Sequence, residues 1–356
     1  MQVTGSRLTF GLSTGRGSDL QRIRDDLAAA NAELASGRRG DVHAGLGQRA
    51  VEAISVRSFA EIERGQIVVN EQTAGRLSVM SDVLSGVRGS LQAFLEIAVP
   101  NRSGPTPTVA AVGDAARTAF DAVAQHLNAS YAGAALFAGI DGARTVVQGW
   151  SQTNAATGSS PRDAVAGAIG GRLIDSASVT AVVADVAAVF QSGPAGAFEG
   201  TIYNGTPSLG SNGQPSARLA VSIGGGAVLD YGIQANDAPF VEVMRGLSML
   251  AAAPPHEIDD TAAYAEWVDA AMSAVEGGVA GVANLETRLG GQQARLDAQM
   301  RRQEDLVRVL EGRTLALEGV DPHEAATRVI NLTNALEASY AATARIGNLT
   351  YLDYMR

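Results

Sequence analysis

The sequence predicts a mainly α-helical fold with a β-rich insert: long helices from both chain ends form an antiparallel coiled-coil bundle, and a small central domain contains strands. Three observations lead to this prediction. Apolar residues recur at spacings of three and four over both ends of the chain. Residues 140–235 are instead rich in Gly, Ser, Thr and Asn and alternate apolar with polar residues. No neighbouring sequence covers the terminal apolar stripes, and an isolated helix of this length is marginal in water, so we expect the ends to meet.

The N-terminal part contains three predicted helices. The first covers residues 19–35, and the glycines that follow it predict a loop. The second covers residues 51–98, residues 100–107 break it, and the third covers residues 109–130. The stripe of the first helix is Leu20, Ile23, Leu27, Ala30 and Leu34. The seam of the second helix, heptad-like in its later part, is Val51, Ile54, Ile62, Val69, Thr73, Leu77, Met80, Leu84, Val87, Leu91 and Phe94.

Alternation in the central region predicts a β-hairpin with a glycine turn at residues 224–226. Its apolar positions are Leu219, Val221, Ile223, Leu229, Tyr231 and Ile233. Asn204-Gly205 and Asn212-Gly213 are further turn signals. One helix, residues 179–190, interrupts this region.

Helical spacing returns in the C-terminal part. A helix begins near Pro239, and a long helix follows from about residue 261 to residue 317. Asp321 as N-cap, Pro322 at the first helical position and Glu324 three residues after the cap predict the start of the last helix. The seam of the long helix is Val282, Leu285, Leu289, Leu296, Met300, Leu306 and Leu310, and that of the last helix is Val329, Leu332, Leu336, Tyr340, Thr343 and Ile346.

We therefore expect five segments. They are an N-terminal assembly helix and connector (1–47), the N-terminal half of a helical rod (48–139), a β-rich outer domain (140–235), the C-terminal half of the rod (236–318) and a C-terminal assembly helix (319–356).

The composition excludes several kinds of chemistry. The 356 residues carry 27 basic side chains, all arginine, and 37 acidic ones, so the net charge is −10. An acidic chain is a poor nucleic-acid binder, because phosphate contacts dominate that affinity. The absence of cysteine removes disulfides, thiolate metal sites and cysteine nucleophiles. The absence of lysine removes the Walker A lysine and Schiff-base chemistry.

The motif search predicts no catalytic, cofactor or metal site. Gly11–Gly15 matches the G-x-S-x-G pattern around Ser13, but that motif needs a strand-to-helix turn preceded by several strands. The histidines are scattered, with no partner at metal-ligand spacing; they are His43, His126, His256 and His323. The glycines at 224–226 and 15–17 do not fit a phosphate-binding loop. We expect a protein that is not an enzyme and takes no cofactor.

Three stretches resemble bacterial flagellin-type proteins. Residues 34–39 (LASGRR) resemble the segment after that family's first helix. Residues 127–139 (LNASYAGAALFAG) resemble the element before its central domain. Residues 321–355, ending in Asn348-Leu-Thr-Tyr-Leu-Asp-Tyr-Met, resemble the C-terminus of its hook–filament junction members. The likeness covers residues 1–140 and 236–356.

The resemblance implies a structural subunit of the flagellum that joins hook to filament. It implies homo-oligomers in the flagellar tube, contacts with an adjacent hook-associated protein and with flagellin, and an export chaperone during secretion. It further implies an extracellular location reached by type III export without a cleaved signal peptide, which agrees with an N-terminus that has no apolar signal segment. With no membrane-length apolar stretch, we expect no membrane insertion.

Other functions stay open from sequence. A filament flagellin is the nearest alternative, followed by a coiled-coil secretion-system translocator or adaptor and by a serine hydrolase that uses Ser13. The residues that we expect to mediate subunit assembly are Leu20, Ile23, Leu27, Leu34, Val329, Leu332, Leu336, Tyr340, Ile346, Leu349, Leu352 and Tyr354.

Overall fold

The computed structural model describes the backbone of residues 6–40, 47–142, 145–172, 174–193 and 196–354, with side chains from Ser18 to Arg345 except Gln48. It is 69% helical, with a small antiparallel β region, which confirms the predicted fold class. The chain divides into two compact units, residues 1–65 with 302–356 (unit 1) and residues 66–301 (unit 2).

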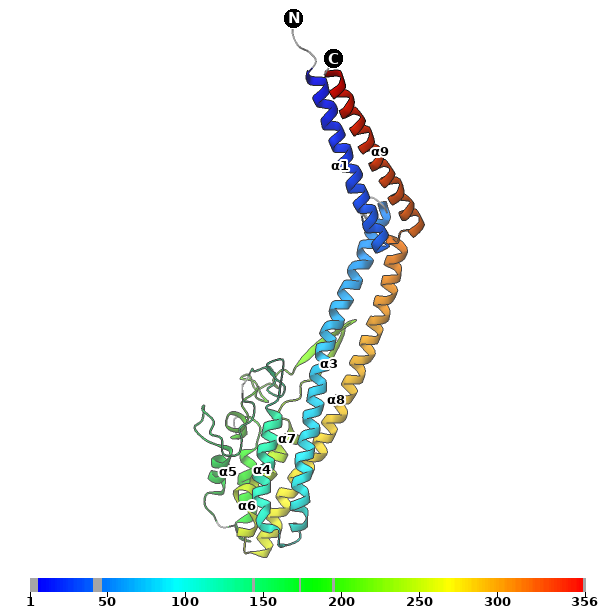
Figure 1. Cartoon of the computed structure of the whole chain (residues 1–356). Coiled ribbons are helices and arrows are strands. Elements are labelled where there is room, and N and C mark those ends of the chain that lie inside the picture. The colour runs from blue at the N-terminus through cyan, green and yellow to red at the C-terminus, as the bar shows by residue number, and fades with distance from the viewer. Residues whose placement is uncertain (1–5, 41–46, 143–144, 173, 194–195, 355–356) are drawn as a thin grey trace. The chain divides into compact units, whose positions relative to one another are not determined.

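Four long helices account for most of the described chain (Figure 1). They are α1 (Ser6–Ser36), α3 (Ala50–Ala98), α8 (Thr261–Glu318) and α9 (Pro322–Tyr354). The shorter elements are α4 (Val109–Leu127), α5 (Pro161–Ile169), α6 (Val179–Val189), α7 (Ala238–Ala252), the strands β1 (Ser130–Tyr131), β2 (Ala134–Ala135), β3 (Ala220–Gly224) and β4 (Ala227–Asp230), and the single turns η1 (Gly47–Arg49), η2 (Val99–Asn101), η3 (Phe198–Ile202) and η4 (Pro255–Glu257).

The start of the first helix differs from the prediction. α1 begins at Ser6, whereas the sequence predicted a start at residue 19. Glycines 11, 15 and 17 each cost about 1 kcal/mol of helix propensity, and this cost favoured a loop in the prediction. α1 packs against α9, and packing along a neighbouring helix outweighs local propensity. Ser13 therefore lies inside a helix and not on the strand-to-helix turn that a nucleophile elbow requires.

The seam of α3 is buried in only one of its two parts. The positions from Leu77 to Phe94 lie in the main core, as predicted. Val51, Ile54, Ile62 and Val69, placed on the same seam by their spacing, are 74, 42, 61 and 44% exposed, so the predicted burial of these four is wrong. Between residues 50 and 65 a different side of α3 from the predicted seam is buried, and it carries Ala53, Val56 and Ala60.

The core of unit 2 is formed by the seam of α3 together with α4, α7, α8 and the insert. Its largest fully buried side chains include Trp267, Phe120 and Phe240. The Trp267 indole donates a hydrogen bond to the carbonyl of Ala253 at 3.1 Å, so its polar atom is satisfied inside the core. Asp260 directly precedes α8, and its carboxylate accepts hydrogen bonds from the backbone N–H groups of Ala263 and Ala262. The hydrogen bond from Ala263 has the largest effect, and together with those from Ser176 and Ala262 it lowers the pKa of Asp260 to about 2.

The predicted hairpin is present. β3 and β4 pair antiparallel through the glycine turn, where Gly225 and Gly226 have φ of +60° and +73°. Two left-handed residues are what a two-residue hairpin turn requires. Asn70 of α3 donates its side-chain N–H to the carbonyl of Ile223 at 3.0 Å, and this bond holds the hairpin on the helix. The predicted helix at 179–190 is α6, whereas α5 was not predicted.

Two adjacent glycines of α8 are expected to respond in opposite directions to alanine substitution. A Cβ at Gly278 would lie 2.4 Å from Val243 Cγ2 and 2.8 Å from the carbonyl oxygen of Pro239, whereas a Cβ at Gly277 meets nothing within 4 Å. We expect Gly278→Ala to push α7 away from α8 and to lower the free energy of unfolding by about 1–3 kcal/mol. Gly277→Ala, the matched control, should raise it by about 0.5–1 kcal/mol. Denaturant melts of both variants test this, and equal shifts would contradict the close approach of the two helices.

Candidate assembly site

The candidate site is the pair of terminal helices in unit 1. α1 and α9 pack against each other, and they lie side by side in antiparallel directions (Figure 1). Each helix has one fully buried alanine, Ala30 of α1 at 2% and Ala325 of α9 at 1% exposure. Larger apolar side chains of both predicted stripes are half-buried; they are Leu20, Ile23, Leu27, Val329, Leu332 and Leu336. Each helix therefore covers part of the stripe of the other.

Other predicted assembly residues are less covered or lie outside the described side chains. Leu34 is 39% and Tyr340 is 42% exposed, and the neighbouring Ile330 is 60% exposed. The side chains of Ile346, Leu349, Leu352 and Tyr354 lie outside the described residues, although the backbone of all four belongs to α9.

Two polar contacts between the helices were not predicted from the sequence. The Arg24 guanidinium donates to the hydroxyl oxygen of Tyr340, at 2.8 Å from Nε, and lies 5.5 Å from the centre of that ring. Arg328 forms an ion pair with Glu33 at 3.1 Å. Both pairs join residues at matching levels of two antiparallel helices, so they fix one alignment of the helices along each other. The sequence contains these side chains, but which of them lie opposite each other becomes clear only when the antiparallel alignment of α1 and α9 is known.

The segment after α1 is attached to the link between α8 and α9. Gly37 ends α1 with φ of +67°, and its carbonyl accepts a hydrogen bond from Val320 N–H at 3.0 Å. Arg39 N–H donates to the carbonyl of Glu318 at 2.8 Å. The Glu318 side chain is fully buried, and its carboxylate pairs with Arg57 of α3. Backbone pairing and a buried ion pair thus connect three elements at one point.

The start of α9 agrees with the predicted cap. The Asp321 carboxylate accepts a hydrogen bond from His323 N–H at 2.8 Å, and Pro322 is the first residue of α9. Glu324, expected to bond back to the cap, forms an ion pair with Arg328 at 3.2 Å instead. Since Arg328 also contacts Glu33, the first turn of α9 is connected to α1.

Arg24→Ala is expected to loosen the contact between α1 and α9. The variant loses the hydrogen bond and the cation–π contact with Tyr340, together worth about 1–2 kcal/mol at a half-exposed site. Arg22→Ala is the matched control, because among the described side chains Arg22 pairs within α1, with Asp19, and both side chains are well exposed. Amide hydrogen exchange over α1 and α9 should accelerate in Arg24→Ala and remain unchanged in Arg22→Ala. Equal exchange in the two variants would show that the Arg24–Tyr340 contact does not hold the helices together.

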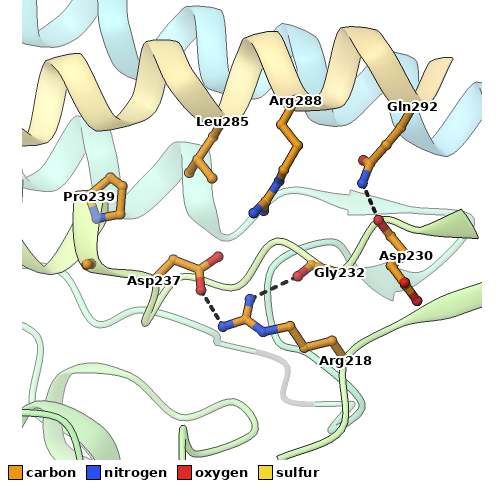
Figure 2. Close-up of a pocket in the computed structure, with 9 residues that line it drawn as sticks. Arg218, Asp230, Gly232, Asp237, Pro239, Leu285, Arg288 and Gln292 are labelled. Atoms are coloured by element: carbon orange, nitrogen blue, oxygen red, sulfur yellow. Dashed lines mark hydrogen bonds and ion pairs between the residues drawn. The ribbon is translucent and has the colours of Figure 1, made fainter. Parts of the chain in front are cut away.

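Unit 2 contains a cavity of about 460 Å³ beside the hairpin, shown in Figure 2. Arg218 donates to the Asp237 carboxylate at 2.6 Å and to the carbonyl of Gly232 at 3.0 Å. This hydrogen bond to the Asp237 carboxylate raises the pKa of Arg218. Gln292 of α8 donates to the carbonyl of Asp230, and Arg288 of the same helix projects into the cavity (Figure 2). These bonds attach the end of the hairpin and the start of α7 to one another and to α8.

The described residues show no metal cluster and no helix suited to cross a membrane. No group of three or more His, Asp or Glu side chains among them could hold a metal ion. His126 contacts Ser90 at 3.4 Å, His256 lies 3.9 Å from Glu257, and His43 lies outside the described residues. None of the helices in the described part of the chain is both long enough and apolar enough to cross a bilayer.

Comparison with known families gives one match. The family model of the bacterial flagellin C-terminal helical region matches residues 272–355, which cover most of α8 and the whole of α9. No curated protein is significantly similar to the chain. Residues 272–355 are therefore similar to the C-terminal helical region of bacterial flagellins.

Proposed function

We propose that this chain is the subunit that joins hook to filament, and that its terminal helices assemble it into the flagellar tube. The observation that carries the proposal is the partial cover of the α1–α9 pair: the stripes are half-buried within one chain, and Leu34, Ile330 and Tyr340 stay exposed. Neighbouring subunits would bury what a single chain leaves open. The match of residues 272–355, which include α9, to the flagellin C-terminal helical region supports that mechanism.

The segments that would act in assembly are residues 1–47 and 319–356. In the proposed tube they form the inner layer, the rod segments 48–139 and 236–318 the next layer, and residues 140–235 face outward. The subunit would contact copies of itself, an adjacent hook-associated protein and flagellin, and an export chaperone would accompany it before secretion. An uncleaved N-terminus read by the type III apparatus would bring it outside the cell.

The choice of a junction subunit rests on the end of the sequence. Residues 348–355, with Asp353-Tyr354 near the end, resemble the C-terminus of junction members of the family. A filament flagellin is the alternative, because the C-terminal match applies equally to it. The two subunits differ in how they grow, since a filament subunit adds repeatedly to its own end and a junction subunit stops after a short layer.

Seeded growth separates the two functions. Purified full-length chain is added to fragments of hook and, separately, of filament, and polymer length is measured by electron microscopy. We expect a short added layer that does not lengthen with time. Continuous elongation into filaments would identify a filament flagellin and overturn the junction assignment.

A further inference from the structure

The cavity beside the hairpin in unit 2 contains a guanidinium group that pairs with none of its neighbours. Two arginines and two aspartates line this cavity of about 460 Å³. Arg218 is paired with Asp237 at 2.6 Å, and Asp230 is exposed to solvent. No hydrogen bond or ion pair joins Arg288 to the other residues drawn in Figure 2. The fork of donors on Arg288 is therefore open to a carboxylate or a phosphate that enters the cavity.

Gln292 of α8 supplies a hydrogen-bond acceptor next to this guanidinium group. Residues four apart lie on the same side of a helix, and the side chains of Arg288 and Gln292 both extend from α8 toward the cavity (Figure 2). The amide nitrogen of Gln292 donates to the carbonyl of Asp230, which can only accept, so the amide oxygen is the end left over. This oxygen, Oε1, is buried and has no hydrogen-bond partner among the described residues. A ligand with an O–H donor would relieve that loss.

An apolar surface lies on the other side of Arg288. Leu285, three residues earlier on α8, is 7% exposed, and half-buried Pro239 of α7 lines the same cavity. From Leu285 to Gln292, α8 thus presents an apolar side chain, a cation and an acceptor within about 10 Å. Cavities of roughly 300–1,000 Å³ that combine apolar walls with a few polar groups are typical of sites for small molecules.

We propose that this cavity binds a small α-hydroxy carboxylic acid with a short apolar side chain. The carboxylate accepts hydrogen bonds from Arg288, the hydroxyl donates to Gln292 Oε1, and the apolar group packs on Leu285 and Pro239. An α-hydroxy acid carries these three groups on one carbon atom, so a single small molecule reaches all three parts of the wall. Every residue of the site belongs to unit 2, and the proposal does not depend on the assembly of the terminal helices.

Three probes test which parts of the ligand are recognised. α-Hydroxyisovalerate has all three groups, isovalerate lacks the hydroxyl, and glycolate lacks the apolar side chain. Ligand-observed NMR titrations with the full-length chain measure each Kd. We expect a Kd on the order of 1 mM for α-hydroxyisovalerate, because the ligand has few atoms. The other two should bind at least about fivefold more weakly. Absence of binding by α-hydroxyisovalerate, or the same Kd for all three acids, would overturn the proposal.

Arg288→Ala tests the anion contact. We expect it to weaken binding of α-hydroxyisovalerate by about tenfold or more, because the carboxylate loses its charged partner. Arg295→Ala is the matched control, since Arg295 is an exposed arginine of the same helix that does not line the cavity. Arg288 is exposed as well and pairs with no residue drawn in Figure 2, so both variants should fold as the natural chain does. Equal Kd values in the two variants would contradict a site at Arg288.

Gln292→Leu tests the hydroxyl contact without depending on the stability of the hairpin. The variant removes the acceptor, and α-hydroxyisovalerate and isovalerate should then bind with the same Kd. Because both acids are compared within one variant, any loosening of the hairpin affects them equally. A preference for the hydroxy acid that persists in Gln292→Leu would show that Oε1 does not receive the hydroxyl.

Inorganic phosphate distinguishes the two classes of anion that suit a guanidinium group. We expect phosphate to displace α-hydroxyisovalerate only at concentrations well above the Kd of the acid, since phosphate has no apolar part to cover Leu285. Tighter binding of phosphate, lost in Arg288→Ala, would identify a phosphate site and overturn the assignment of a carboxylic acid.

Discussion

Removal of residues 322–356 is expected to abolish assembly while unit 2 stays folded. The deletion takes away the whole of α9, so α1 loses the helix against which it packs. A single helix of 31 residues is marginal in water without such a neighbour. The main core is untouched, because its members lie between Leu77 and Leu296.

The two tryptophans make this result measurable. Trp150 and Trp267 are the only tryptophans of the chain, and both are buried in unit 2. Their fluorescence therefore reports the unfolding of unit 2, and we expect the same melting temperature within a few degrees for the full and the truncated chain. Sedimentation reports assembly, which should be lost. A truncated chain that still forms polymers would contradict the role given to the terminal helices, and a lower melting temperature would contradict the independence of unit 2.

A full-length variant tests whether the stripe or merely the length of α9 matters. Replacement of Val329, Leu332 and Leu336 by serine keeps the length of α9 but removes three half-buried apolar side chains of its stripe. We expect the same loss of polymer as in the truncation, because burial of these side chains drives the contact. If the serine variant assembles normally, the backbone of α9 and its polar contacts suffice.

Periodicity in the sequence predicted the long helices and the hairpin because both are local patterns. The spacing of Leu77 to Phe94 and the alternation around Gly224–Gly226 each need only neighbouring residues to be recognised. Whether an apolar stripe is covered depends on elements far away in the sequence. The stripe of α3 looks uniform along its length, yet its part from Val51 to Val69 is exposed.

The short helix α5 was missed although its start is readable. Ser160 and Asp163 form a capping box, with Ser160 Oγ accepting from Asp163 N–H at 3.1 Å. Nine residues rich in small side chains have too little periodicity to compete with the turn signals around them. The contacts at the assembly site were missed for another reason. Arg57 and Glu318 are separated by 261 residues, and no local pattern connects them.

Arg57→Ala is expected to lower the free energy of unfolding of unit 1 by more than the loss of a single surface ion pair usually does. The variant leaves the carboxylate of Glu318 fully buried and uncompensated, because Arg57 pairs with Oε2 and Oε1 has no hydrogen-bond partner among the described residues. Breaking a fully buried pair costs about 3–5 kcal/mol, and since Arg57 is itself 44% exposed we expect about 2–4 kcal/mol. The loss should reach α1, because the backbone of Glu318 holds Arg39 after the end of that helix.

Arg64→Ala is the matched control for this experiment. Arg64 joins the same two helices through Glu311, but both side chains are about half exposed, at 49 and 47%, so we expect less than about 1 kcal/mol. Hydrogen exchange over α1 and residues 37–40 measures both variants. A third variant, Arg57→Ala with Glu318→Leu, removes the buried charge together with its partner and should recover most of the lost protection, because an apolar side chain needs no counter-ion. Equal losses in Arg57→Ala and Arg64→Ala would mean that burial of Glu318 does not set the stability of this junction.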